Sequence, residues 1–294
     1  MTAIANPGTT RRLEITRPDG SVGRIAYDDQ GAGPVVLLAP AMGTTRATFR
    51  HLAPLLLRAG YRVVTTDYRG LGESDTGWAE YSSAATADDL AALIRHLNAG
   101  PVLLYSNSYT CASSVHLAAD HAELLRGVVL AGPFVRTPPA AGFAAKATAS
   151  LMTKPMLTRS MWMMWFPRMF PKPPADHAEM RAAVKANLSE PGRTKVLARM
   201  FAGNHDAAEA KLGNAKASAL PTLVLMGTAD ADFPDAAAEG RFVADSLGAR
   251  LELLDGYGHQ PHEEAPELIA ELIGGLDPAA PAGSAARPVA RTAH

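Results

Sequence analysis

The sequence predicts an α/β protein whose core is a mostly parallel β-sheet with helices on both faces. Short runs such as 34–38, 102–105 and 222–226 are continuously apolar, which is typical of strands buried on both sides. Amphipathic helical patterns separate these runs, and an alternation of buried strands with helices favours parallel pairing. The chain has 294 residues and is 47% hydrophobic, which is enough to form a large core.

The predicted strands and helices follow one another in a regular order along most of the chain. Two short strands come first, and the turn-forming Pro18-Asp19-Gly20 joins them. The helix after the third strand has apolar residues at helical spacing and ends at Gly60, a typical C-terminal cap. Strands are predicted at 12–17, 23–27, 34–38, 61–66, 102–105, 127–131, 221–227 and 250–254, and helices at 47–59, 84–98, 110–125, 235–247 and 263–276.

The alternation breaks in one long segment that has several helical patterns, punctuated by Pro and Gly, and no clear strand. Six of the eleven methionines lie between Met152 and Met169. Such adaptable side chains suit a pocket for apolar ligands, and equally the inner face of an insert packed on the sheet. The end of the chain is rich in Ala and Pro without apolar periodicity. We therefore predict an α/β core at 1–135 and 221–276, an inserted helical cap at 136–220 and a disordered tail at 277–294.

Composition excludes several classes of function. The formal net charge is −1, from 28 basic and 29 acidic residues, so no basic surplus indicates nucleic-acid binding. The single cysteine, Cys111, excludes an internal disulfide and most cysteine-based metal sites. No window approaches the roughly 18 apolar residues of a membrane span, and the first twenty residues lack the apolar core of a signal peptide. We expect a cytoplasmic protein with no membrane span and no nucleic-acid partner.

Ser108 is the strongest candidate for a nucleophile. A serine hydroxyl is weak at its own pKa, so it must be exposed beside a base, and a sharp strand-to-helix turn achieves that exposure. Such a turn requires small residues two before and two after the nucleophile, and Ser106 and Thr110 meet this requirement for Ser108. A nucleophile at Ser106 would instead put Leu104 in the first of the two positions.

Two further residues complete an ordered Ser–Asp–His series. Asp230 lies just past the end of the strand at 221–227, where a carboxylate is able to orient a histidine, while Asp232 lies farther from the strand end and is the less favoured alternative. His259 follows two glycines after the last strand, whereas His262 is expected at the surface or as a helix cap. Each member of the series follows its own strand, and that order is far more specific than any single residue.

Two backbone N–H groups are predicted to form an oxyanion hole. Ala41 lies in the loop after the first buried strand, and Tyr109 follows the nucleophile at the start of a helix. The glycine loop at 67–74 is interpreted as scaffold. No set of His, Asp and Glu at metal-ligand spacing and no Gly-rich phosphate loop is present, so we expect neither a metal nor a cofactor.

On these residues the chain resembles the α/β-hydrolase superfamily over nearly its whole length. The landmarks are D-Y-R-G-L-G-E-S at 67–74, S-N-S-Y-T at 106–110, G-T-A-D-A-D-F-P-D at 227–235 and G-H at 258–259. The resemblance implies an eight-stranded, mostly parallel sheet, a helical cap after the sixth strand and the triad Ser108, Asp230 and His259. Two features differ from the family: Ala39-Pro40 stands where His-Gly is usual, and small polar residues replace the glycines that flank the nucleophile.

The function that follows from the resemblance is cleavage of a carboxylic ester, thioester or lactone. The substrate would be a small molecule with an apolar acyl portion, bound in a pocket formed by Met42, Met161, Trp162, Met164 and Trp165. Two alternatives stay open: a non-hydrolytic or C–C-bond-cleaving enzyme on the same fold, such as a natural-product tailoring enzyme or cofactor-free perhydrolase, and a ligand-binding sensor on a weakly active scaffold. Epoxide hydrolases and haloalkane dehalogenases resemble this fold but use an aspartate as the nucleophile, so the serine disfavours both.

Overall fold

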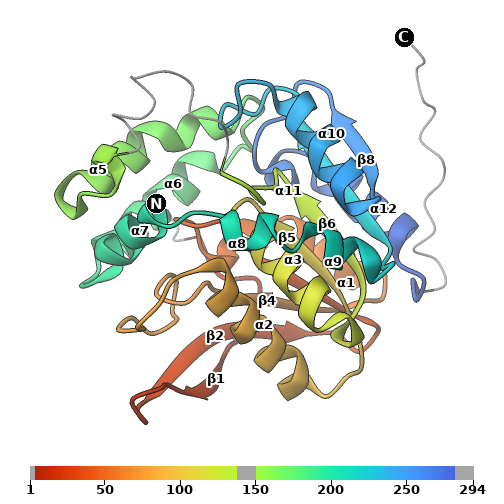
Figure 1. Cartoon of the computed structure of the whole chain (residues 1–294). Coiled ribbons are helices and arrows are strands. Elements are labelled where there is room, and N and C mark those ends of the chain that lie inside the picture. Colours follow the sequence, from red (N-terminus) through yellow and green to blue (C-terminus); the bar gives the residue numbers. More distant parts are fainter. Residues whose placement is uncertain (1–3, 138–149, 282–294) are drawn as a thin grey trace.

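A single eight-stranded sheet forms the centre of the protein, in the order β1-β2-β4-β3-β5-β6-β7-β8 (Figure 1). The computed structural model describes residues 4–137 and 150–281. The strands are β1 (Thr10–Thr16), β2 (Val22–Gln30), β3 (Val35–Ala39), β4 (Arg62–Thr66), β5 (Val102–Asn107), β6 (Leu125–Ala131), β7 (Thr222–Gly227) and β8 (Arg250–Leu254). β2 pairs antiparallel with β1 and β4, and all other neighbours pair parallel. The predicted fold class is confirmed.

Helices cover both faces of the sheet, and each face has its own apolar core. In β3, Val36 and Leu38 belong to the core shared with α1 (Leu52–Arg58) and α12 (Pro266–Leu276). The alternate residues of β3, Val35, Leu37 and Ala39, face the opposite core. That core also contains residues of α2 (Ser83–Leu97), α3 (Thr110–Asp120) and α10 (Ala236–Leu247). Successive residues of a strand point to opposite faces, so burial on both faces requires the continuous apolar runs on which the strand predictions rest.

Three predicted helices are shorter or interrupted in the structure. The helix predicted at 47–59 divides into the 3₁₀ turn η1 (Arg46–Phe49) and α1, and the one at 110–125 ends at Asp120 before the turn η2 (Ala122–Leu124). The last helix divides into α11 (Pro261–Glu264) and α12, because Pro266 cannot continue the hydrogen-bond ladder of α11. In the described part of the chain no helix is long and apolar enough to cross a bilayer.

The segment between β6 and β7 contains two sets of helices. α5 (Pro155–Trp165), the turn η3 (Phe166–Met169), α6 (His177–Ser189) and α7 (Arg193–Ala202) pack against one another beside the sheet and form what we call the α5–α7 group (Figure 1). α8 (Asp206–Glu209) and α9 (Leu212–Ala217) pack on α3 instead, so they extend the helical layer of the sheet. Part of the predicted cap, 138–149, lies outside the described residues.

The first residue of the predicted tail is held by the core. Asp277 is buried, and its carboxylate accepts two hydrogen bonds of 2.8 Å from the guanidinium of Arg126. Residues 278–281 are also described, while 282–294 of the predicted tail lie outside the described residues. The chain therefore stays attached to the sheet beyond the last helix.

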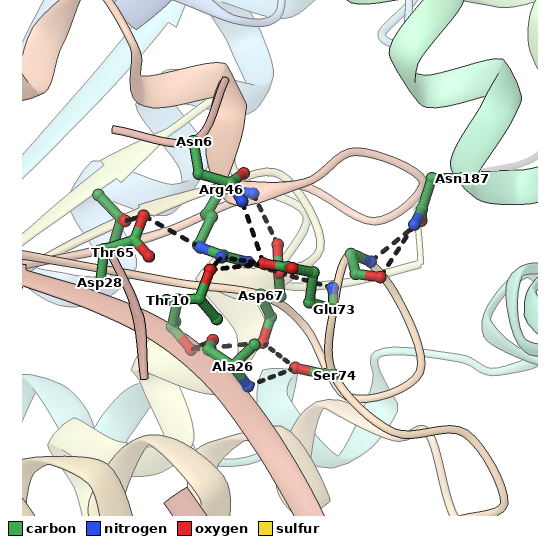
Figure 2. A network of polar contacts seen from close by, with 12 residues as sticks. Asn6, Thr10, Ala26, Asp28, Arg46, Thr65, Asp67, Glu73, Ser74 and Asn187 are labelled. Carbon is green, nitrogen blue, oxygen red and sulfur yellow. Dashed lines mark hydrogen bonds and ion pairs between the residues drawn. The ribbon is translucent and has the colours of Figure 1, made fainter. Parts of the chain in front are cut away.

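A buried ionic network fixes the glycine loop after β4. The fully buried guanidinium of Arg46 pairs with Asp28 at 3.1 Å and also with Asp67 and Glu73 (Figure 2). Asp67 further accepts backbone N–H bonds from Arg46 and Glu73, at 2.8 and 2.9 Å. From α6, the side-chain amide of Asn187 exchanges two hydrogen bonds with the loop backbone, at 3.0 and 2.9 Å. The loop thus joins the sheet to the α5–α7 group and acts as scaffold.

Candidate active site

Ser108 occupies a sharp turn between β5 and α3. Its backbone has φ of +60°, a left-handed conformation that is rare for residues other than glycine and is typical of functional sites under strain. The Ser108 N–H donates to the carbonyl of Ala131 at the end of β6, and the Ser108 carbonyl accepts from Cys111 in α3, both at 2.9 Å. The turn is therefore fixed from both sides.

The other polar side chains around this turn are engaged in the core. Ser106 is fully buried; its hydroxyl accepts a 2.8 Å bond from Ser114 and donates to the carbonyl of Val129. Burial raises the pKa of the Cys111 thiol to about 12, which disfavours a thiolate nucleophile. Among the described residues, by contrast, the Ser108 hydroxyl has no hydrogen-bond partner.

Thr110 connects the turn to the loop that carries Ala41. The Thr110 hydroxyl donates to the carbonyl of Pro40, so the residue that replaces a family glycine also fixes the substituted Ala39-Pro40 segment. Ala41 and Tyr109 are 2% and 3% exposed, and the N–H groups of both have no partner within the described chain. Buried N–H groups are almost always paired, so the unpaired ones of Tyr109, next to Ser108, and of Ala41, next to Pro40, are compatible with an oxyanion hole.

Asp230 and His259 are in direct contact. The Asp230 Oδ2 atom lies 2.7 Å from His259 Nδ1, and both side chains are almost fully buried. Asp230 follows β7 and His259 follows β8, so the parallel strands bring both residues to the same edge of the sheet. Gly132, with φ of +52°, passes so close that an added Cβ would lie 2.9 Å from Nδ1 of the ring. Only glycine fits at that position.

Asn107 is a positioning residue that the sequence did not reveal. Its side-chain amide donates to the carbonyl of Ala131 and to the carbonyl of His259, both at 2.9 Å. It directly precedes Ser108, so one side chain joins the ends of β5 and β6 to the histidine loop. In the sequence, Asn107 is recognisable only as a polar residue at the end of an apolar strand. That pattern does not predict which carbonyl groups its side chain contacts.

Asp232 also reaches the histidine, from the opposite side. Its Oδ2 atom lies 3.3 Å from His259 Nε2, and its Oδ1 atom accepts a 2.5 Å bond from the indole N–H of Trp165. Burial alone would lower the pKa of His259, but the carboxylates of Asp230 and Asp232 outweigh it and raise the pKa to about 9. No hydrogen bond joins His259 to Ser108 in the described structure.

Three possible ligand groups for a metal ion meet at this point, although the sequence shows no such set. Ligand atoms of Asp230, Asp232 and His259 lie within 4.8 Å of one another. The two aspartates are close in sequence, but the histidine comes from another loop, so the spacing of residues in the chain did not reveal the cluster. Each nitrogen of the ring already faces a carboxylate, and we interpret the cluster as an acid–base site.

Aromatic side chains lie near His259 and near Tyr109, the residue after Ser108. Phe134 stacks on Phe233 with ring centroids 4.5 Å apart and lies 5.8 Å from the ring of His259. His205 lies 4.9 Å from Tyr109, and burial lowers the pKa of His205 to about 4, so this histidine is neutral at pH 7. Beside its carboxylates, the site therefore has an aromatic side formed by Phe134 and Phe233.

The predicted pocket residues divide between the inside and the outside of α5. Trp162 is buried and donates a 3.1 Å bond from its indole N–H to the carbonyl of Gly43, next to Met42. Met42 and Met161 are half-buried against the same core. Met164 is 63% exposed, so its predicted place in the pocket is wrong: it lies two residues, or about 200° of helical rotation, from Trp162.

The predicted surface position of His262 is also wrong. It was expected at the surface, yet it is fully buried; its Nδ1 atom lies 3.0 Å from the Tyr105 hydroxyl and its Nε2 atom 2.9 Å from that of Thr48. Burial lowers the pKa of His262 to about 3. The imidazole is therefore a neutral core residue that attaches the start of α11, just after His259, to β5 and η1.

Comparison with known proteins finds relatives of similar sequence. The chain is 28% identical over 275 residues to haloalkane dehalogenase 2 of Mycobacterium bovis, covering 87% of this chain and 92% of the relative. It is 34% identical over 122 residues to 2-(acetamidomethylene)succinate hydrolase of Mesorhizobium japonicum, covering 40% of this chain and 43% of the relative. The chain thus spans less than half the length of the relatives that it matches at 34% identity.

A solved structure supports the assignment. A thermophilic esterase from Thermogutta terrifontis superimposes with a TM-score of 0.70 at 25% identity, covering 90% of this chain and 96% of the esterase. The sequence pattern of the family described as serine aminopeptidase, S33, matches residues 30–266. The chain thus has the α/β-hydrolase fold and belongs to this serine aminopeptidase, S33, family.

Proposed function

We propose that the protein is a serine hydrolase that cleaves carboxylic esters, thioesters or lactones with an apolar acyl portion. The observation that carries the proposal is the 2.7 Å contact between Asp230 and His259, at the edge of the sheet where Ser108 occupies its left-handed turn. The contact orients the imidazole, because the Nδ1–H group points at a carboxylate, and Nε2 is the atom that would exchange a proton with Ser108.

The reaction proceeds in two halves. The Ser108 oxygen attacks the substrate carbonyl while His259 Nε2 accepts the hydroxyl proton, and collapse of the tetrahedral intermediate expels the leaving group with that proton. Water then attacks the acyl-enzyme, His259 again accepts a proton, and the Ser108 oxygen takes it back as the acid is released. Asp230 stabilises the imidazolium form in both halves.

The oxyanion would be stabilised by the N–H groups of Ala41 and Tyr109. Each lacks another partner among the described residues, and a single such donor contributes about 2.7–4 kcal/mol to stabilisation of the transition state. The apolar acyl portion is supported by the aromatic surroundings, in particular Phe134 and Phe233. A serine at position 108 argues against dehalogenase chemistry, despite the similarity to a haloalkane dehalogenase.

A series of p-nitrophenyl esters with acyl chains from two to twelve carbons tests this proposal. We expect hydrolysis by the wild-type protein, with kcat/KM rising from acetate to medium chains, and loss of at least a thousandfold in Ser108→Ala. Ser106→Ala is the matched control, since it removes a nearby buried hydroxyl, and it should retain activity. Equal hydrolysis by wild type and Ser108→Ala would contradict the assignment of the nucleophile, and preference for acetate would contradict the apolar substrate.

A further inference from the structure

Both nitrogens of the His259 ring face a carboxylate. Asp230 is at 2.7 Å from Nδ1, as the proposed triad requires, but Asp232 is at 3.3 Å from Nε2. Nε2 is the atom that must accept the proton of Ser108 in the proposed reaction. Asp232 therefore occupies the side of the ring that the nucleophile needs.

The α5–α7 group holds Asp232 in this place. The indole N–H of Trp165, the last residue of α5, donates to Asp232 at 2.5 Å, and the Asp232 backbone N–H donates to Asp230 at 2.9 Å. A few residues later, the carbonyl of Met169 accepts a 2.9 Å bond from the N–H of His259. One segment of chain thus contacts both the histidine and the carboxylate that covers it.

The charges around the ring favour its cationic form. The side chain of Asp232 is only 15% exposed, so its attraction to an imidazolium is weakly screened. Glu264 of α11 adds a third negative charge, and it is held by the backbone N–H groups of Lys172 and Gly258, both at 2.6 Å. No positive charge opposes these groups from the histidines nearby, His205 and His262, since burial lowers the pKa of both.

We propose that Asp232 is a positioning residue that competes with Ser108 for the Nε2 atom of His259, and that Trp165 holds it in the competing position. While Asp232 contacts Nε2, both nitrogens of the imidazole are paired with carboxylates, and the ring is unable to accept a proton from Ser108. When α5 moves and Asp232 leaves, His259 keeps Asp230 alone, as in the proposed triad. This inference rests on the proposed function only in what it says about Ser108, because the Asp232–His259 contact has its own test.

The test is an NMR titration of the His259 ring, with His259→Gln used to assign its signals among the nine histidines. We expect Asp232→Asn to lower the pKa of His259 by about one unit or more, because a charged partner of the ring becomes neutral. Trp165→Phe should also lower the pKa of His259, by a smaller amount. This variant tests the contact if Asp232→Asn does not fold. Asp235→Asn is the matched control: it removes a nearby carboxylate that caps α10 and has no contact with His259, and it should leave the pKa unchanged.

The second measurement is the rate at which a fluorophosphonate labels Ser108 at pH 7. We expect Asp232→Asn to react roughly three- to tenfold faster than wild type, since one pKa unit corresponds to a tenfold change in the neutral fraction. An unchanged His259 pKa in folded Asp232→Asn, or labelling with the same pH dependence as wild type, would overturn the inference. A shifted pKa with Ser108 unlabelled in every variant would support the contact between Asp232 and His259 while contradicting the proposed function.

Discussion

The hydroxyl of Thr110 donates a hydrogen bond to the carbonyl of Pro40, which ties the first residue of α3 to the loop that carries Ala41. Both partners stand at positions where the sequence departs from the usual pattern of the α/β-hydrolases. The bond shows how the two departures fit together: a threonine replaces a glycine beside the nucleophile, and its hydroxyl fixes the substituted loop. Because Ala41 follows Pro40 and Tyr109 precedes Thr110, we expect this contact to set the spacing of the two proposed oxyanion donors.

Replacing Thr110 by Val should therefore impair the site while keeping the shape of the side chain. The carbonyl of Pro40 would be left buried without this donor, at a cost of about 1–3 kcal/mol in the free energy of unfolding. We expect kcat/KM to fall roughly tenfold or more, because Ala41 shifts relative to Tyr109. Thr110→Ser keeps the hydroxyl and should retain most of the activity. Equal kcat/KM for the Val and Ser variants would show that the hydrogen bond does not position the loop.

Gly132→Ala should disable the site by displacing His259. An added Cβ would lie 2.9 Å from Nδ1 and 3.0 Å from the carbonyl oxygen of the histidine, so the ring must move away from Asp230. Gly77→Ala is the matched control, because Gly77 also has positive φ but nothing within 4 Å of the added atom. Both variants should lose stability on the order of 1 kcal/mol from backbone strain. Only Gly132→Ala should lose activity by a hundredfold or more. The activity is measured as ester hydrolysis, and circular dichroism checks that both variants are folded.

The raised pKa of His259 should make stability fall in the alkaline range. The folded protein holds the histidine proton up to about pH 9, whereas the unfolded chain releases it near 6.5. This contribution is fully present below pH 6.5 and is lost as pH rises through 9, and it amounts to on the order of 3 kcal/mol. Urea unfolding at pH 6, 8 and 10 measures it. His259→Gln should lack this part of the pH dependence, and an identical dependence in both proteins would refute the raised pKa.

The fold was predictable because its signals are local. Each central strand is a continuous apolar run, and Ser108, Asp230 and His259 come shortly after the ends of β5, β7 and β8, so parallel pairing brings all three to one edge of the sheet. The contacts made by Asp232 were not predictable in this way. Its partners come from loops and helices 27 and 67 residues away, and no local pattern states which loop turns toward which side chain.

Two errors in the predicted site have simple physical reasons. His262 lies in a short polar stretch that is typical of a surface, but its partners Thr48 and Tyr105 are 214 and 157 residues away and bury it. Met164 was grouped with Met161, Trp162 and Trp165 by composition alone. Residues 161 to 165 cover more than a full turn of helix, so they cannot all face one pocket.

The measurement that tests the account most directly is the mapping of a fluorophosphonate adduct by mass spectrometry. The wild-type protein should carry one adduct, on the peptide that contains Ser108, and Ser108→Ala should carry none while its circular dichroism spectrum stays unchanged. His259→Gln should be labelled far more slowly, because the base that activates the serine is missing. An adduct on Ser106 would show that the nucleophile has been misassigned, and a folded wild-type protein that stays unlabelled from pH 7 to 10 would contradict the proposed serine hydrolase.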